Sequence, residues 1–152
     1  MKNLKVRDVM TKKVVAVNIG TSVVEVAHIL TRNRFHGVPV VNEKNQLVGI
    51  ITESDFFIKS IPNLYLPSYI ELISSTKFAK RLSTGEQKRI NMLVNATAGD
   101  IMTGKCYSVS SLISVSDLFR IFKKKGYYTV PVTDKNGKLA GIVTLADIIK
   151  ML

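Results

Sequence analysis

The sequence predicts an α/β protein built from two copies of one β-α-β-β-α unit. Residues 6–60 return as residues 98–152 without insertion or deletion, so adding 92 to a position in the first copy gives its counterpart. Each copy has 55 residues, and a ~60-residue domain buries only about 60% of its unfolded surface. Because one copy is marginal alone, we expect the two copies to share a core.

The same order of elements is predicted in each copy. Apolar runs at 14–17 and 106–109 favour a first strand. Ser22 and Ser114 then precede a carboxylate by three residues and an apolar stripe at helical spacing, which is typical of a helix start. The later predicted elements are strands at 38–41, 47–51, 129–133 and 139–143, polar hairpin turns at 42–45 and 134–137, and last helices from about Glu53 and Leu145.

A segment without a counterpart, residues 61–97, separates the copies at 1–60 and 98–152. Its residues 68–81 predict an amphipathic helix, and Ser83 predicts the cap of a second, basic helix. This helical insert could dock a partner, a membrane surface or a second subunit. It could equally be a connector packed on its own module.

Composition narrows the function only partly. Twenty-two Lys and Arg against eleven Asp and Glu give a net charge of +11, which favours anionic partners such as a nucleotide, a nucleic acid or an acidic membrane. Cys106 is the single cysteine, so an intramolecular disulfide is impossible and a zinc cluster implausible. No stretch approaches the roughly 18 apolar residues of a membrane span, and the first residues lack a signal peptide. We expect a cytoplasmic protein without a metal site.

Candidate binding residues lie where a predicted strand passes into a helix, at residues 49–55 and 141–147. Both segments read Gly-x-x-Thr-x-x-Asp, and their glycine lets another group approach the backbone closely. The threonine falls at a helix N-terminus, where free amides favour a phosphate. The aspartate would repel a phosphate but accepts hydrogen bonds from a ribose diol. These residues are Thr52, Asp55, Thr144 and Asp147.

The simpler explanation is structural. Thr-x-x-Asp is close to a capping box and can serve only to cap a helix. One such segment alone favours capping. Two of them, at identical spacing after matching strands, favour a nucleotide site.

With these motifs in view, both copies resemble cystathionine-β-synthase (CBS) domains, and the chain resembles a tandem CBS pair, also called a Bateman module. The resemblance covers roughly three quarters of the chain. Its six marks are Asp8–Thr11, Asp100–Thr103, the two Val-Pro-Val runs at 38–40 and 130–132, and the two Gly-x-x-Thr-x-x-Asp segments. It implies two copies packed through their sheets about a pseudo-two-fold axis. Two clefts would then bind AMP, ADP, ATP, S-adenosylmethionine or cyclic di-AMP.

The resemblance also assigns roles. It gives the ribose hydroxyls to the two aspartates and the phosphate to the two threonines, and it places Ile50 and Ile142 against the base. Val15 and Tyr107 lie on the predicted first strands, which supply base contacts in the family, sometimes to the other copy's cleft.

The position two residues before each Val-Pro-Val run is His36 in the first copy and Tyr128 in the second. In kinase-regulating members a histidine there touches phosphate, so Tyr128 departs from the pattern. The next position, often arginine in those members, is Gly37 or Thr129, which argues against a tightly held triphosphate. His36 can equally be a hydrogen-bonded structural residue. Tyr107, Tyr127 and Tyr128 can likewise be ordinary half-buried strand aromatics, and the Met10 and Met102 pair can be core filler.

Three classes of function remain to be weighed. A ligand sensor fits the paired sites. An enzyme does not, because the sequence offers no nucleophile with its base and no P-loop or metalloprotease motif. A nucleic-acid binder or a scaffold with empty clefts is the alternative, although no reading motif accompanies the charge. We therefore expect a non-catalytic regulatory module that binds an adenosine-based ligand, forms a homodimer through helix faces and acts on a partner in trans.

Overall fold

The computed structural model describes residues 4–57 and 83–151, so the helix predicted at 68–81 lies outside the described residues. The chain forms two compact units, and each unit combines parts of both copies. The first unit contains Met1–Ala16, Val41–Val48 and Lys105–Leu152, and the second contains Val17–Val40 and Gly49–Gly104. Both units have a small sheet with helices, as the α/β prediction requires.

The first unit is built on a three-stranded sheet in the order β5-β6-β7. The β5–β6 pair is parallel and the β6–β7 pair is antiparallel, with Val130 opposite Val143. The hairpin turn between β6 and β7 ends at Gly137, whose φ of 76° confirms the predicted turn. The elements of this unit are α1 (Val6–Val9), β5 (Val109–Ser110), α6 (Val115–Lys125), β6 (Thr129–Thr133), β7 (Leu139–Thr144) and α7 (Leu145–Ile149).

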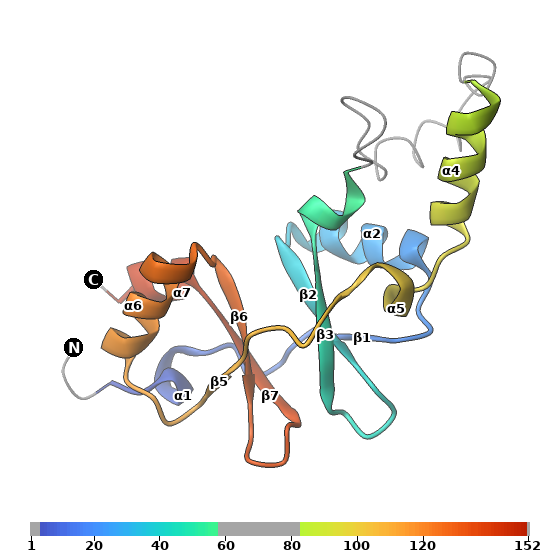
Figure 1. Cartoon of the computed structure of the whole chain (residues 1–152). Helices are drawn as coiled ribbons and strands as arrows, with labels where there is room; N and C mark the ends of the chain where they lie inside the picture. The colour runs from blue at the N-terminus through green and yellow to red at the C-terminus, as the bar shows by residue number, and fades with distance from the viewer. Residues whose placement is uncertain (1–3, 58–82, 152) are drawn as a thin grey trace. The chain divides into compact units, whose positions relative to one another are not determined.

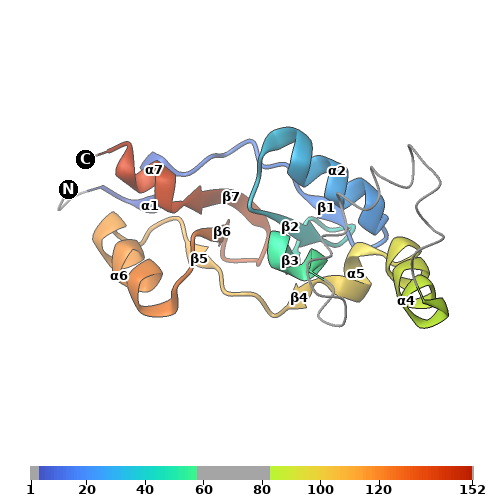
Figure 2. The same ribbon diagram turned by 90° about the horizontal axis from the view of Figure 1, so that it is seen from above.

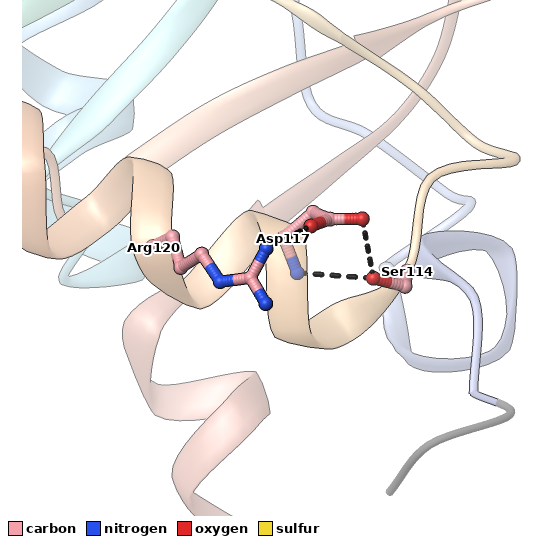
Figure 3. A network of polar contacts seen from close by, with 3 residues as sticks. All are labelled: Ser114, Asp117 and Arg120. Atoms are coloured by element: carbon pink, nitrogen blue, oxygen red, sulfur yellow. Dashed lines mark hydrogen bonds and ion pairs between the residues drawn. The ribbon is translucent and has the colours of Figure 1, made fainter.

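Helix α6 begins where the sequence predicts. The Ser114 hydroxyl accepts a hydrogen bond from the Asp117 amide over 3.0 Å, and Arg120 reaches back to the same aspartate. The helix ends at Gly126, whose φ of 67° is the left-handed conformation that glycine adopts without strain. Figure 3 shows this cap at the first turn. The buried core below it consists of Val6, Val109, Val115, Leu118, Phe122, Val130, Val132, Val143 and Ile148.

The second unit holds a four-stranded sheet in the order β1-β2-β3-β4. Strands β3 and β4 are antiparallel, with Gly49 opposite Gly104 and Ile50 opposite Thr103. The elements of this unit are β1 (Val17–Asn18), α2 (Val23–Asn33), β2 (Gly37–Val41), β3 (Leu47–Thr52), the 3-10 turn η1 (Glu53–Phe56), α4 (Thr84–Val94), α5 (Ala98–Ile101) and β4 (Thr103–Gly104).

Helices α2 and α4 confirm two predicted starts. Ser22 accepts from the Glu25 amide, and Ser83 accepts from the Glu86 amide. Every residue of β2 is buried, and α2 buries one stripe of apolar side chains. Besides β2, the buried apolar residues of this unit are Val17, Val23, Val26, Ala27, Leu30, Ile51, Phe56, Ile90 and Ala98.

The leading segments of the two copies, residues 5–11 and 97–103, are exchanged. The Val6 amide of the first copy donates to the Ile113 carbonyl of the second over 3.0 Å. The equivalent bond joins the copies in the reverse order, since the Ala98 amide of the second copy donates to the Thr21 carbonyl of the first over 2.7 Å. Figures 1 and 2 both show α1 beside elements of the second copy. Each copy therefore completes its fold with the leading segment of the other copy.

The predicted first strands at 14–17 and 106–109 are wrong in their bounds. The structure has β1 at Val17–Asn18 and β5 at Val109–Ser110, so most of each apolar run lies outside the ladder. The first run crosses from one compact unit to the other at residue 17, and the second follows such a crossing at residue 105. A segment that connects two compact units has no neighbouring strand to pair with, even where its residues have a high strand propensity.

The last predicted helices begin where expected. Helix α7 starts at Leu145, whereas the described part of the first-copy equivalent is a 3-10 turn from Glu53 to Phe56. The short helices α1 and α5 were not predicted, since four residues are too few to show a helical period. No helix within residues 4–57 or 83–151 is long and apolar enough to cross a membrane.

Candidate functional site

The two strand-to-helix segments have the same local geometry. The Thr52 amide donates to Asp55 Oδ2 over 2.7 Å, and the Thr144 amide donates to Asp147 Oδ2 over 2.8 Å. The threonine hydroxyls donate to the same carboxylate oxygens, over 3.1 Å and 2.7 Å. Both aspartates thus lie on the side of the first turn that the sequence predicts, and both form the capping box of the simpler explanation.

One oxygen of each carboxylate remains available. Among the described residues, no hydrogen bond reaches Oδ1 of Asp55 or Asp147, while Oδ2 is held by two bonds from threonine. A fixed carboxylate with one open oxygen can accept strong hydrogen bonds from a sugar hydroxyl. The threonine hydroxyls are already committed to the carboxylates, so a phosphate can take their hydrogen only after the hydroxyl rotates.

Capping boxes also occur where no site is predicted. Thr97 donates to Asp100 from both its amide and its hydroxyl over 2.8 Å, and the Lys5 amide donates to Asp8 over 2.9 Å. The box therefore does not identify a ligand site. Burial separates the two pairs, because Asp8 and Asp100 are exposed whereas the aspartates at 55 and 147 are half-buried. Helices of four and five residues also align few peptide dipoles, so individual amides and hydroxyls would bind a phosphate here.

His36 lies at the start of the first-copy segment. Its Nδ1 is 3.1 Å from Glu53 Oε2, and its carbonyl accepts from the Glu53 amide over 3.3 Å. In the second copy the Tyr128 carbonyl accepts from the Leu145 amide over 2.9 Å. The two positions are thus structurally equivalent, and both adjoin the proposed site. The histidine ring has a partner in the glutamate, which sequence reasoning did not identify because 17 residues separate the two.

The compact units divide the predicted site residues unequally. The second unit contains Thr52, Asp55, Ile50 and His36; the first contains Thr144, Asp147, Ile142, Tyr128, Val15 and Tyr107. Val15 is a first-copy residue, and it groups with the second copy because the segment before it lies along β7. There the Thr11 amide donates to the Ile142 carbonyl over 2.9 Å, and the reverse bond is 3.0 Å. Neither Val15 nor Tyr107 lies on a strand, which corrects their predicted placement.

Tyr107 belongs to an aromatic cluster of the first unit. Its ring centroid is 5.8 Å from that of Tyr127, and Lys125 Nζ lies 4.9 Å from the Tyr107 centroid. A cation over a ring face is attracted by the ring quadrupole. Tyr128 is 68% exposed and Tyr127 is 39% exposed. The sequence analysis did not identify this contact, because no local pattern encodes it.

A cavity of about 690 Å³ lies in the second unit beside Asp55. Helix α4 of the insert supplies Arg89 and Met92 to its wall, and α5 supplies Asp100. The backbone and side-chain hydrogen bonds from Thr97 hold the pKa of Asp100 below its usual value. Part of the insert therefore adjoins the first-copy aspartate, which its sequence did not indicate. Within the described residues, no group of three His, Cys, Asp or Glu side chains is placed to hold a metal ion.

Comparison with known proteins gives consistent results. The CBS domain matches residues 6–60 and 98–152. Protein MJ1426 of Methanocaldococcus jannaschii is 32% identical over 97% of this chain and 90% of its own length. Two other relatives are longer, and the chain spans 64% and 62% of them.

Solved structures share the fold. CBSX2, a protein of Arabidopsis thaliana, in complex with AMP has a TM-score of 0.72 at 24% identity, over 98% of this chain and 96% of that one. The CBS domain pair of protein MJ0100, in complex with 5′-methylthioadenosine and S-adenosyl-L-methionine, has a TM-score of 0.67 at 24% identity over 97% and 98%.

Proposed function

Because this chain belongs to the CBS domain family, as its repeated motifs predicted, we propose that it is a regulatory module that binds an adenosine derivative. The observation that carries the proposal is the carboxylate of Asp55 and of Asp147, in which threonine holds Oδ2 and no hydrogen bond within residues 4–57 and 83–151 reaches Oδ1. Two proteins of the same fold support the ligand class, one in complex with AMP and one with 5′-methylthioadenosine and S-adenosyl-L-methionine.

In this proposal each aspartate recognises the ribose. Its Oδ1 accepts a hydroxyl hydrogen, while the two threonine bonds keep the carboxylate oriented, so little side-chain entropy is lost on binding. The threonine hydroxyl turns from the aspartate to the ligand's phosphate where one is present. Ile50 and Ile142 flank the base; Val15, Tyr107, His36 and Tyr128 complete the contacts.

The proposed action is regulatory and not catalytic. A ligand changes a module's behaviour only by binding one conformation better than another, and the response would reach a partner protein in trans. The module would assemble as a homodimer through helix faces and act in the cytoplasm. Exposed apolar side chains on α6 and α7 support such an interface, since Phe119 is 47% exposed and Ile149 is 57% exposed.

One observation favours a second candidate, a nucleic-acid binder. The Tyr107, Tyr127 and Lys125 cluster combines exposed rings with a cation, which is the chemistry of a base-stacking platform. The two functions are separable by their response to salt, because binding to a polyanion releases counterions and weakens steeply as salt rises.

Thermal shift tests the proposal with AMP, ATP, S-adenosylmethionine, 5′-methylthioadenosine and cyclic di-AMP, with single-stranded DNA as the competing ligand. A regulatory adenosine site predicts a higher melting temperature with at least one of these adenine compounds. A rise with DNA alone, lost at high salt, would favour the second candidate. No rise with any adenine compound at millimolar concentration would refute the proposed function.

A further inference from the structure

We infer that the two sites take adenosine derivatives of different charge. The second-copy site, at Thr144 and Asp147, takes a phosphorylated adenosine. The first-copy site, at Thr52 and Asp55, takes an adenosine derivative without a phosphate. This inference rests on the proposed function and adds the ligand class of each site.

The nearest difference between the sites is the residue after the threonine. It is Glu53 in the first copy and Leu145 in the second. A phosphate held by Thr52 would lie beside the Glu53 carboxylate as well as Asp55, whereas at Thr144 it would meet Asp147 alone. Like charges a few ångströms apart repel each other by about 1 kcal/mol even in bulk water. The first site therefore discriminates against phosphate.

His36 lies beside this glutamate. Its Nδ1 is 3.1 Å from Glu53 Oε2, so this ring nitrogen would have to leave the glutamate to contact a ligand phosphate. The pair is largely exposed, with side chains 77% and 47% accessible. The second copy has the uncharged Tyr128 and Leu145 at these positions.

The hydrogen-bond partners of the two threonine hydroxyls also differ between the sites. Thr52 Oγ1 lies 2.8 Å from Ser54 Oγ in addition to its bond with Asp55. The counterpart of Ser54 is Ala146, which has no hydroxyl, and among the described residues the Thr144 hydroxyl is hydrogen-bonded to Asp147 alone. Each threonine hydroxyl has two hydrogen-bond contacts, but only that of Thr52 contacts a second side chain, the Ser54 hydroxyl.

The wider electrostatic field agrees with the local one. Over its residue range the first unit, which contains Asp147, has fourteen Lys and Arg against five Asp and Glu. The second unit, which contains Asp55, has eight Lys and Arg against six Asp and Glu over its range. Its described residues alone have four Lys and Arg against five Asp and Glu. The cavity beside Asp55 adds the Asp100 carboxylate and one cation, Arg89. Anionic ligands are thus attracted to the first unit at long range.

Isothermal titration of the full chain with AMP and with 5′-methylthioadenosine tests the inference. We expect one strong AMP site, which Asp147→Ala abolishes and Asp55→Ala leaves intact. We expect 5′-methylthioadenosine still to bind the Asp147→Ala variant, through the first-copy site. Two AMP sites of equal affinity in the unaltered chain would overturn the inference and leave the proposed function standing. The absence of binding heat with AMP and with 5′-methylthioadenosine would refute both the inference and the proposed function.

Exchanging the distinguishing residue gives a matched test of the cause. Glu53→Leu should strengthen AMP binding at the first-copy site about fivefold, and Leu145→Glu should weaken it at the second-copy site about fivefold. The affinity for uncharged 5′-methylthioadenosine should change less than about twofold in either variant. Glu53→Gln, which keeps the side-chain size, repeats the test if Glu53→Leu folds poorly. Equal changes for both ligands would contradict an electrostatic cause.

Discussion

The sulfur of Met10 lies 2.6 Å from the position that a β-carbon would occupy on Gly141. The same relationship joins Met102 to Gly49, again at 2.6 Å. In each case the methionine belongs to the leading segment of one copy and the glycine to a strand of the other. The exchange of leading segments therefore depends on a glycine at this point of the strand, which confirms the predicted close approach to both glycines.

Gly141→Ala should lower the free energy of unfolding by about 1–3 kcal/mol, since the added methyl group overpacks a tight contact. Gly104→Ala is the matched control, because a β-carbon there meets no atom within 4 Å. Chemical denaturation of both variants measures the difference.

The methionine supplies a second check. If its sulfur causes the strain, Gly141→Ala should cost less in a Met10→Ala background than in the unaltered chain. An equal cost in both backgrounds would show that the contact is not responsible. The equivalent rescue of Gly49→Ala by Met102→Ala should be slightly weaker, because the Thr103 carbonyl lies 2.9 Å from the new methyl, whereas the Thr11 carbonyl lies 3.1 Å from the methyl added at Gly141.

The cap of α6 predicts that substituting Ser114 and substituting Arg120 change the free energy of unfolding by different amounts. Ser114→Ala should cost about 1 kcal/mol of stability, as it removes the acceptor for the Asp117 amide. Arg120→Ala should change stability by less than about 0.5 kcal/mol, since its ion pair with the aspartate is exposed. Figure 3 shows the three residues. Thermal or urea unfolding separates the outcomes, and a larger loss for the arginine variant would contradict this account of the cap.

Asp147→Ala should lower both stability and ligand binding, whereas Asp8→Ala should lower stability alone. Both remove a capping carboxylate and should cost about 1 kcal/mol. Only the first should also abolish adenosine-ligand binding in its own site, as its half-buried carboxylate holds the ribose. Calorimetry beside urea unfolding measures both. Normal binding by the Asp147→Ala variant would mean that this aspartate only caps its helix.

The stability of the chain should fall in acid for an identifiable reason. Hydrogen bonds from Thr97 lower the pKa of Asp100, and those from Ser83 lower the pKa of Glu86. A carboxyl with a lower pKa when folded stabilises the fold above its unfolded pKa, and this contribution is lost as pH falls through the folded pKa. Asp100→Asn and Glu86→Gln should therefore each narrow the stability difference between pH 7 and pH 3. Unchanged differences in urea titrations would contradict the assignment.

Cys106 should react slowly with a thiol reagent. Burial raises the pKa of its thiol, so less thiolate is present at pH 8 than in a free cysteine. We expect the rate with Ellman's reagent to lie below that of the urea-unfolded chain and to rise with pH. A rate equal to the unfolded chain's would show that the thiol is freely accessible.

The repeat allowed much of this structure to be predicted. The three Ser-capped helices, both hairpins and the capped turns at Thr52 and Thr144 follow from local patterns whose bonds span three or four residues. The exchange of leading segments did not follow, because its bonds join residues about a hundred positions apart, such as Val6 and Ile113. For the same reason the pairing of His36 with Glu53 and of Lys125 with Tyr107 could not be read from the chain.

A crystal structure of the full chain grown with saturating AMP tests the central claim most directly. The account predicts AMP with a ribose hydroxyl on Oδ1 of Asp147 and the Thr144 hydroxyl turned from that aspartate to the phosphate. Density for AMP at another place, or a segment unchanged and empty at millimolar AMP, would contradict it.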